Sequence, residues 1–361
     1  MRKIVSYFLF FSFFLALDVL IIQYLINNQS NTSSPEISLT KSSLIKTQIP
    51  SKQQLSFDSI FSYQDPASNQ SRQPDEITLL ATGDVIPARS VNYQMVKLND
   101  FRYPFAKTAD FLKNSDITFI NLETPLIPNC QPTVEGMVFC GDEKAVEGLV
   151  SAGVKVANIA NNHMSDYGIE GINNTTKLLQ QNNIAVCGNG SPAILDIKGK
   201  KFGFLGYNDI SERYDLLPSP KIDILQKDIR DLKIKADYVI VAFHWGVEYT
   251  SSPSARQKEL AHSAIDAGAD LIIGNHPHWV GAVEQYKDKF TTYAHGNFIF
   301  DQMWSQETRE GVIGKYIFGD TGLKSVNFYS VIIENYSQPR FATQTEAEKI
   351  LLRIKTNSFK E

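Results

Sequence analysis

The chain has 361 residues and a mass of 40.5 kDa, enough for one large domain or two small ones. Its formal net charge is -4, with 35 Lys and Arg against 39 Asp and Glu, so it lacks the basic character of a general nucleic-acid binder. Hydrophobic residues make up 43% of the chain and only three cysteines are present, which excludes wholesale disorder and a Cys₄ metal site. Any metal must therefore be held by His, Asp, Glu or Asn.

The N-terminus contains an apolar run at residues 4–26 that a single charge, Asp18, interrupts. At about 1.5 Å per residue, a helix of this length can cross a hydrocarbon core of roughly 30 Å. Arg2 and Lys3 precede the run, so the positive-inside rule keeps the N-terminus in the cytoplasm and exports the rest. A cleaved signal peptide is the alternative, although its apolar core is usually shorter and ends in an Ala-x-Ala-like site. The sequence predicts that residues 1–26 anchor a single-pass membrane protein with an extracytoplasmic domain.

Residues 27–76 are predicted to be a flexible linker, because twelve serines and many Asn, Gln and Thr occur there with little apolar periodicity. Within it, residues 55–63 have enough hydrophobic content to dock on a domain. No Pro- or Ser-rich break divides residues 77–345, which we interpret as one α/β domain. Residues 346–361 are assigned as a C-terminal tail.

Short β-rich runs alternate with helical patterns from residue 77 onward, which predicts βαβ units and a mostly parallel sheet covered by helices. The predicted strands are Ile77–Thr82, Ile117–Ile120, Val154–Ile159, Ile184–Cys187, Tyr238–Phe243 and Leu271–Ile273. The predicted helices are Pro104–Asn114, Glu143–Ala152, Ile169–Gln181 and Ala255–Ala267. Two hairpins are predicted around Gly199 and Asp288, and a late strand at Ser325–Glu334.

Metal-ligating side chains follow five of the predicted strands. In an open parallel sheet the carboxyl ends of the strands share one rim, so we expect these side chains to lie together. In His276-Pro277-His278, an extended backbone would point both imidazoles to one face. Mixed imidazole and carboxylate ligands suit Zn, Mn or Fe better than Mg or Ca. We therefore predict one or two divalent transition metal ions. The predicted ligands are Asp84 and His278 on one ion, Asn162, His244 and His276 on the other, and Glu123 bridging both.

The order of these motifs resembles the calcineurin-like metallophosphoesterases and, more closely, the CapA-type capsule-synthesis family, which is associated with poly-γ-glutamate export and anchoring. The motifs that carry the resemblance are Gly83-Asp84-Val85 with Arg89, Asn121-Leu122-Glu123, Asn161 to Gly168, His244 to Tyr249, His276-Pro277-His278 and Gly296 to Asp301. The resemblance implies a four-layer α/β/β/α metallophosphoesterase-like sandwich. Ile86 stands where the wider superfamily has a His, and Glu123 where it has an Asp, which leaves open whether one or both metal sites fill.

Three further residues are predicted to be catalytic. The resemblance implies that His163 is a general acid or orients the substrate; the alternative is a structural cap at the strand end. Asp166 either accepts a hydrogen bond from a site histidine or caps the helix that begins near Ile169. Arg89 either binds an anionic group of the substrate or forms a surface ion pair. Glu248 is interpreted as a partner of His244 or as a solvated surface residue.

The remaining histidines and cysteines receive mainly structural interpretations. His295 is expected to be structural rather than an extra ligand, and His262 lies inside a helical pattern. Cys130 and Cys140 lie in a loop-like insertion that would overhang the site, and in an exported domain we expect them to form a disulfide; otherwise they are free thiols. Cys187 ends an apolar strand and is expected to be buried and free.

The resemblance implies a membrane-anchored extracytoplasmic metalloprotein in capsule or poly-γ-glutamate biosynthesis, export or release. A metal-dependent phosphoesterase and a non-catalytic module that binds an anionic polymer remain the alternatives. The expected partners are an anionic polymer or phosphoester substrate, and a membrane synthase or transporter. No nucleic-acid partner is expected.

Overall fold

The computed structural model describes residues 57–68, 73–210 and 216–361, all of which belong to the unit Gln53–Glu361. The predicted anchor and most of the predicted linker lie outside the described residues. Among the residues that are described, no helix is both long and apolar enough to span a membrane.

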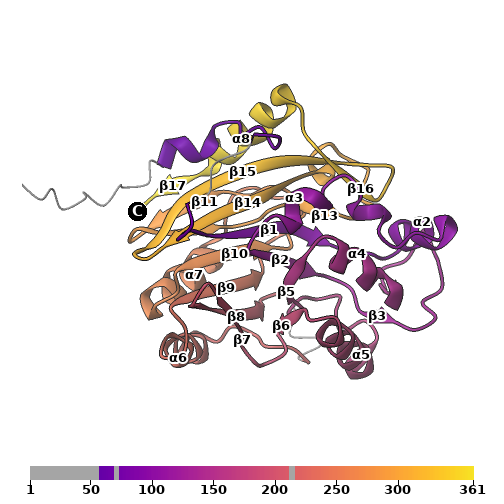
Figure 1. The fold of residues 1–361 in the computed structure, drawn as a ribbon, viewed down its shortest axis with the longest axis horizontal. Coiled ribbons are helices and arrows are strands. Elements are labelled where there is room, and N and C mark those ends of the chain that lie inside the picture. The colour runs from indigo at the N-terminus through magenta and orange to yellow at the C-terminus, as the bar shows by residue number, and fades with distance from the viewer. Residues whose placement is uncertain (1–56, 69–72, 211–215) are drawn as a thin grey trace, which may run out of the picture. The chain divides into compact units, whose positions relative to one another are not determined.

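Two mixed β-sheets form the frame of the domain (Figure 1). The first has the strand order β16 (Gln338–Phe341), β15 (Gly322–Glu334), β14 (Glu310–Gly319), β1 (Ile77–Val85), β2 (Ile117–Leu122), β5 (Val154–Asn158) and β6 (Ala185–Cys187), with β13 (Asn297–Ile299) also pairing with β1. The second has the order β17 (Phe359–Lys360), β11 (Val283–Tyr286), β12 (Lys289–Thr292), β10 (Leu271–Asn275), β9 (Tyr238–His244), β8 (Lys200–Asn208) and β7 (Ala193–Ile197). A short parallel pair, β3 (Leu126–Ile127) and β4 (Gly141–Asp142), stands apart. One mostly parallel sheet was predicted, whereas both sheets are mixed. The first is parallel from β1 to β6 and antiparallel from β1 to β16. The second is parallel from β12 to β8, with antiparallel pairs on both sides of this centre.

Helices and short 3₁₀ turns connect and cover the strands. The α-helices are α2 (Ser90–Leu98), α3 (Ala109–Lys113), α4 (Val146–Ser151), α5 (Gly168–Gln181), α6 (Ile222–Lys233), α7 (Ala255–Ala267) and α8 (Gln344–Asn357). The 3₁₀ turns are η1 (Phe57–Phe61), η2 (Tyr103–Phe105), η3 (Glu143–Ala145) and η4 (Glu307–Arg309). Capping boxes begin α7 at Ser254 and α8 at Thr343, where each hydroxyl accepts a hydrogen bond from the third helical residue. Helix α7 ends at Gly268, whose φ of 115° suits a residue without a Cβ.

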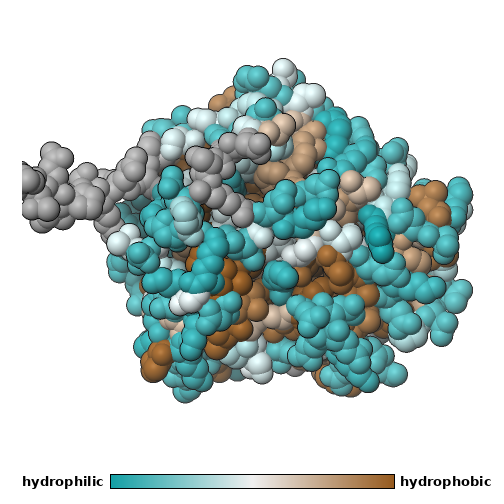
Figure 2. Space-filling model, in the orientation of Figure 1, coloured by the Kyte–Doolittle hydropathy of each residue, from teal (hydrophilic) through white to brown (hydrophobic). Residues whose placement is uncertain are grey.

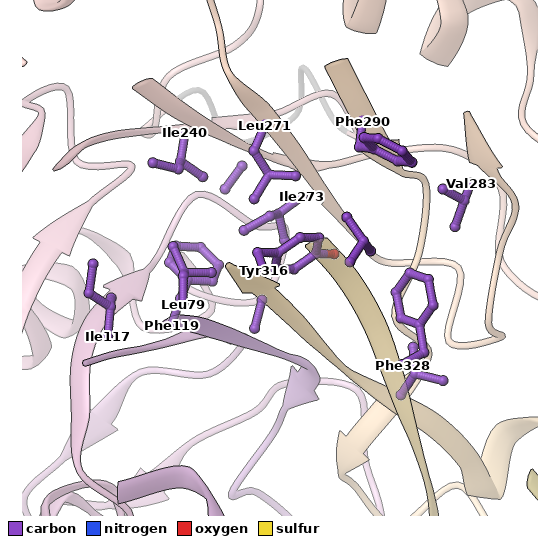
Figure 3. Close-up of a cluster of buried hydrophobic side chains, with 14 of the residues drawn as sticks. Leu79, Ile117, Phe119, Ile240, Leu271, Ile273, Val283, Phe290, Tyr316 and Phe328 are labelled. Carbon is purple, nitrogen blue, oxygen red and sulfur yellow. The ribbon is translucent and has the colours of Figure 1, made fainter. Parts of the chain in front are cut away.

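Three hydrophobic clusters show how the layers stack. One cluster lies between the sheets and joins side chains such as Leu79 and Phe119 of the first sheet to Ile240 and Ile273 of the second (Figure 3). A second cluster joins the outer face of the first sheet to α2, α3, α4 and α5. A third joins the outer face of the second sheet to α6 and α7. The described domain therefore has four layers in the order α/β/β/α, as expected.

The domain extends beyond both of its predicted boundaries. In the predicted linker, η1 buries Ile60, and Phe57 packs on Phe290 with 6.4 Å between ring centroids. At the other end, α8 buries Ile350 among the residues between the sheets, and β17 pairs with β11. The segment assigned as a tail thus closes the hydrophobic core. On the face drawn in Figure 2, hydrophilic residues cover most of the surface and hydrophobic ones show mainly in recesses, as expected where outer helix faces meet water.

Candidate metal centre

The predicted ligands come from the strand ends of both sheets. Asp84 lies near the end of β1 and Glu123 directly follows β2, both in the first sheet. His244 ends β9 and His276 directly follows β10, in the second sheet. The expected single rim is therefore a meeting point of two sheets, whose carboxyl ends converge at one edge of the sandwich.

Two overlapping groups of side chains share Glu123. The carboxylate of Glu123 and the ring nitrogens of His244 and His276 lie within 4.8 Å of one another. A second group, with the same limit, joins the carboxylates of Asp84 and Glu123 to His278. Asn162 completes the first group, because its Oδ1 lies 2.7 Å from Nε2 of His244. The structure thus brings all six predicted ligands together, in the two groups expected from the sequence.

The environment of Glu123 shows that a cation fits this cluster. Its side chain is fully buried, and neither carboxylate oxygen has a hydrogen-bond partner among the described residues. Nε2 of His244 lies 3.3 Å from Oε1 of Glu123, 3.1 Å from Nδ1 of His276 and 2.7 Å from Oδ1 of Asn162. A single imidazole nitrogen carries at most one proton and cannot satisfy three such neighbours. A divalent transition metal would satisfy this convergence of imidazole, carboxylate and amide donors.

The charges of the neighbouring groups lead to the same conclusion. Burial alone would raise the pKa of Asp84, but the hydrogen bond and the positive charge of His278 hold that pKa below its ordinary value. Burial opposes the charged form of His278, yet the hydrogen bond with Asp84 and the charge of Glu123 raise its pKa to about 9. Burial and the imidazoles around it lower the pKa of His276 well below its ordinary value. Asp84 and Glu123 thus share one positive imidazole, His278, and one negative charge among these three groups remains unbalanced.

Asparagines that the sequence analysis did not assign hold the cluster in place. Nδ2 of Asn121 donates to Oδ1 of Asp84 at 2.9 Å and lies 3.2 Å from Nδ1 of His244. Asn158 at the end of β5 donates to Oδ1 of Asn121 at 2.9 Å. Oδ1 of Asn297 in β13 lies 2.9 Å from Nδ1 of His278. The signal that could have found them is the recurrence of Asn at strand ends, since outer polar groups orient metal ligands.

The backbone at His276-Pro277-His278 differs from the expected extended conformation. His276 has a φ of 98° and His278 a φ of 58°, both on the positive side. This turn lets the backbone N–H of His276 donate to Oδ2 of Asp84 at 3.3 Å, while Nδ1 of His278 lies 3.3 Å from the same oxygen. The carbonyl of Pro277 in turn accepts from the backbone N–H of Tyr249 at 2.8 Å. The two imidazoles still converge, but through tight backbone turns and not through strand periodicity.

Beside the metal ligands, His163 and Asp166 form a hydrogen-bonded pair. Nδ1 of His163 lies 2.9 Å from Oδ2 of Asp166, which also accepts from the backbone N–H of Phe139 at 2.7 Å. Asp166 therefore orients a site histidine, one of the two roles considered for it. No side chain caps α5, whose N-cap residue is Tyr167.

Arg89 is engaged within the protein. Its guanidinium pairs with Asp301 and lies over the rings of Phe139 and Phe300, 5.0 and 4.9 Å from their centroids. The Arg89 side chain is 11% exposed. Of the two roles considered, the structure favours an ion pair, and the pair is buried and not on the surface.

Three other titratable residues were considered near the centre. Glu248 is exposed, which fits the surface role considered for it, and its carboxylate groups with His276 and His278 and not with His244. Nδ1 of His295 lies 3.2 Å from the carbonyl oxygen of Gly274, and its Nε2 lies 3.0 Å from the hydroxyl of Tyr316, which supports a structural role. His262 contacts Glu284 at 2.6 Å in a separate cluster between α7 and β11.

The cysteines are arranged as expected for an exported domain. Cys130 and Cys140 form a disulfide with 5.9 Å between their Cα atoms. Cys187 is buried and free, and burial raises the pKa of its thiol. The disulfide closes a loop that contacts His163 through Phe139, whose ring stacks on the imidazole at 4.0 Å.

Comparisons with known proteins show the family of this chain. The family described as "Bacterial capsule synthesis protein PGA_cap" matches residues 78–302, which include every predicted ligand. The "Capsule biosynthesis protein CapA" of Bacillus anthracis is 29% identical over 313 residues, 80% of this chain and 75% of that protein. The "PGA biosynthesis protein CapA" of Bacillus subtilis (strain 168) is 29% identical over 259 residues, 67% of this chain and 68% of that protein. A solved structure of a phosphatase from Mycoplasma pneumoniae has a TM-score of 0.48 and 13% identity over 73% of this chain and 95% of its own, too distant a likeness for an inference. From the family match over residues 78–302, we conclude that this chain belongs to the bacterial capsule synthesis protein family PGA_cap.

Proposed function

We propose that the protein acts at the cell surface in the synthesis, export or release of an anionic polymer of the poly-γ-glutamate type, using divalent transition metal ions. The family and the names of the Bacillus relatives support the polymer. One observation carries the metal part of the proposal. It is the buried carboxylate of Glu123, which lacks a hydrogen-bond donor and lies within reach of imidazoles on both sides. Leaving a buried carboxylate unpaired costs several kcal/mol, and a cation removes that cost.

The position of each residue at the site suggests its role. Asp84 and His278 would hold one ion, Asn162, His244 and His276 the other, and Glu123 both. Bound metal would supply Lewis acidity toward a carbonyl or phosphoryl oxygen and a lowered pKa of water. Because Asp166 accepts from Nδ1 of His163, Nε2 is the ring nitrogen left for the substrate, and it would give a proton to a leaving group when the imidazole carries both protons.

The proposed location is outside the cytoplasmic membrane. The Cys130–Cys140 disulfide supports it, because disulfides persist mainly in oxidising compartments. The apolar run at residues 4–26 would hold the domain near a membrane synthase or transporter that handles the polymer. Hydrolysis of a phosphoester remains a second candidate, since the His163–Asp166 pair beside the metal ligands would serve a phosphoryl centre equally well.

The test measures metal content in the full chain after purification without chelators. Two equivalents of a transition metal that fall to one or none in Glu123→Ala would support the shared centre. One equivalent would point to a single-ion site, consistent with Ile86. No metal after supplementation would refute the metal part and favour a binding module. Glu334→Ala is the matched control and should leave the content unchanged, because the carboxylate of Glu334 pairs with Lys107 and Arg340 away from the candidate ligands.

The cellular role is tested by deletion and complementation. The wild-type gene should restore the surface polymer and His276→Ala should not, because His276 lies in the group that also contains Glu123 and His244. Normal polymer in the deletion strain would contradict the proposed role. Turnover of 4-nitrophenyl phosphate that disappears in Asp84→Ala would favour the phosphoester alternative.

A further inference from the structure

The residues predicted to be catalytic are connected through a side chain that the sequence analysis left unassigned, Phe139. Its ring stacks on the imidazole of His163, with 4.0 Å between centroids and 22° between planes. Its backbone N–H donates to Oδ2 of Asp166 at 2.7 Å. The guanidinium of Arg89 lies over the same ring at 5.0 Å, and Phe300 meets it edge-on at 5.8 Å. Phe139 therefore contacts His163, Asp166 and Arg89 at once, while only 2% exposed itself.

These contacts determine both the tautomer and the plane of His163. A carboxylate oxygen only accepts, so the close Nδ1 of His163 must carry the proton, which leaves Nε2 without one in the neutral ring. By donating to Oδ2 of Asp166, the backbone N–H of Phe139 keeps that oxygen within hydrogen-bonding distance of Nδ1 of His163. The stacked ring then restricts rotation of the imidazole about its Cβ–Cγ bond. The orientation of the His163 ring and the position of its partner Asp166 thus both depend on contacts with Phe139.

Phe139 is held in turn by covalent and backbone bonds at the base of its loop. The next residue, Cys140, is bonded to Cys130. Immediately beyond it, β4 pairs with β3, and the N–H of Gly141 donates to the carbonyl of Pro125 at 2.9 Å. The tip between the cysteines is exposed by contrast, as at Val134, which is 55% exposed. The loop is therefore fixed at its base, beside Phe139, and open to solvent at its tip.

We propose that Phe139, fixed by the Cys130–Cys140 disulfide, is a positioning residue that aims His163 at the substrate. This inference rests on the proposed function, because it gives His163 a task at that site. It assigns the disulfide loop a specific role, namely to make the site complete only in the folded, oxidised form of the domain. If Phe139 only packed in the core, it would stabilise the domain as a whole without controlling the orientation of the His163 imidazole.

The positioning itself is tested by NMR on the full chain saturated with diamagnetic Zn²⁺. The signal is the hydrogen-bonded Nδ1–H of His163, assigned by its absence in His163→Gln. Phe139→Leu, which keeps apolar bulk but loses the ring, and the double variant Cys130→Ser/Cys140→Ser should increase its exchange with water at least tenfold. Phe139→Tyr, which keeps the ring, and Val134→Ala, an exposed change in the same loop, should leave it unchanged. Wild-type exchange in both Phe139→Leu and the double variant would overturn the proposal.

The functional consequence is tested by complementation with the same variants. Changes beside metal centres typically reduce activity about 10- to 100-fold. We expect surface polymer in Phe139→Leu to fall by about tenfold while metal content stays within twofold of wild type. Polymer that stays normal in Phe139→Leu but is lost in His163→Gln would overturn the proposal, as would loss of metal from Phe139→Leu. If the wild-type gene fails to restore polymer although the NMR response is as expected, the proposed function fails and the positioning stands.

Discussion

Replacing Glu123 with Gln is expected to make the metal-free protein more stable than the wild type. With metal bound, the wild type is expected to be the more stable protein. Without metal, the substitution removes a fully buried carboxylate that has no hydrogen-bond donor. An unsatisfied buried group costs about 1–3 kcal/mol, and more when it is charged. Gln has the same shape and its amide can donate to Oδ1 of Asn162 or to Nε2 of His244. We therefore expect metal-free Glu123→Gln to be about 1–3 kcal/mol more stable than the wild type.

With metal, the order changes. A ligand at 100 times its Kd stabilises the folded state by about 2.7 kcal/mol, and the wild type should gain this amount. Glu123→Gln should gain little, because it lacks the carboxylate that both groups share. For a domain of this size, 1 kcal/mol corresponds to roughly 2 °C in Tm. Wild-type Tm should therefore rise by about 5 °C on adding Mn²⁺ or Zn²⁺ at this concentration. At 1,000 times the Kd, where the gain is about 4.1 kcal/mol, the wild type should become the more stable of the two proteins.

The assay is thermal unfolding of the full chain in EDTA and in a metal series. Glu284→Gln is the matched control, because Glu284 is equally buried but its oxygens contact His262 and Tyr293 at 2.6 Å each. Glu284→Gln should be less stable than the wild type both in EDTA and with metal. The reasoning is refuted if Glu123→Gln is less stable than the wild type in EDTA, or if metal leaves the wild-type Tm unchanged.

Three further outcomes are expected. Burial lowers the pKa of His295 to about 4, so protonation of the unfolded chain should cost about 3 kcal/mol of stability as the pH falls from about 6.5 to 4. The free energy of unfolding, measured by urea titration at a series of pH values, should fall less steeply with decreasing pH in His295→Leu. A dependence on pH equal to that of the wild type would contradict the assignment. Ile350→Ala in α8 should destabilise the domain by about 2–5 kcal/mol in urea unfolding, since Ile350 is fully buried; a cost under about 1 kcal/mol would show that α8 is dispensable. The double change Cys130→Ser/Cys140→Ser should cost about 2–3 kcal/mol for so short a loop, and equal stability with and without reductant in the wild type would argue against it.

Local patterns in the sequence determined much of this domain. Apolar runs located the strands that carry the site, such as Tyr238–Phe243, which is β9 apart from its last residue. The polar residues directly after those runs identified the candidate ligands, because a strand end fixes where the next side chains must lie. The export prediction also led to the Cys130–Cys140 pair. All of these depend on residues close together in the chain.

Some elements were missed although their patterns are local. In α6, Leu225, Ile229 and Leu232 recur at helical spacing and are buried, yet no helix was assigned. In α8, the buried Ile350 and Ile354 lie one helical turn apart in a segment interpreted as a tail. Such short amphipathic patterns do not reveal which surface will cover them, so the sequence did not distinguish a packed helix from an exposed end.

Only the tertiary structure decided how the site is assembled. Glu123 is shared between its neighbours because the first sheet meets the second at this edge, and no local pattern encodes that contact. Arg89 pairs with Asp301, 212 residues later in the chain, so its availability to a substrate depends on long-range packing. Phe139 reaches His163 because a disulfide and the β3–β4 pair bring their loop across the site. The sequence by itself determined which groups are present at the strand ends, whereas the packing of two sheets determined which of them meet, since those contacts join residues far apart in the chain.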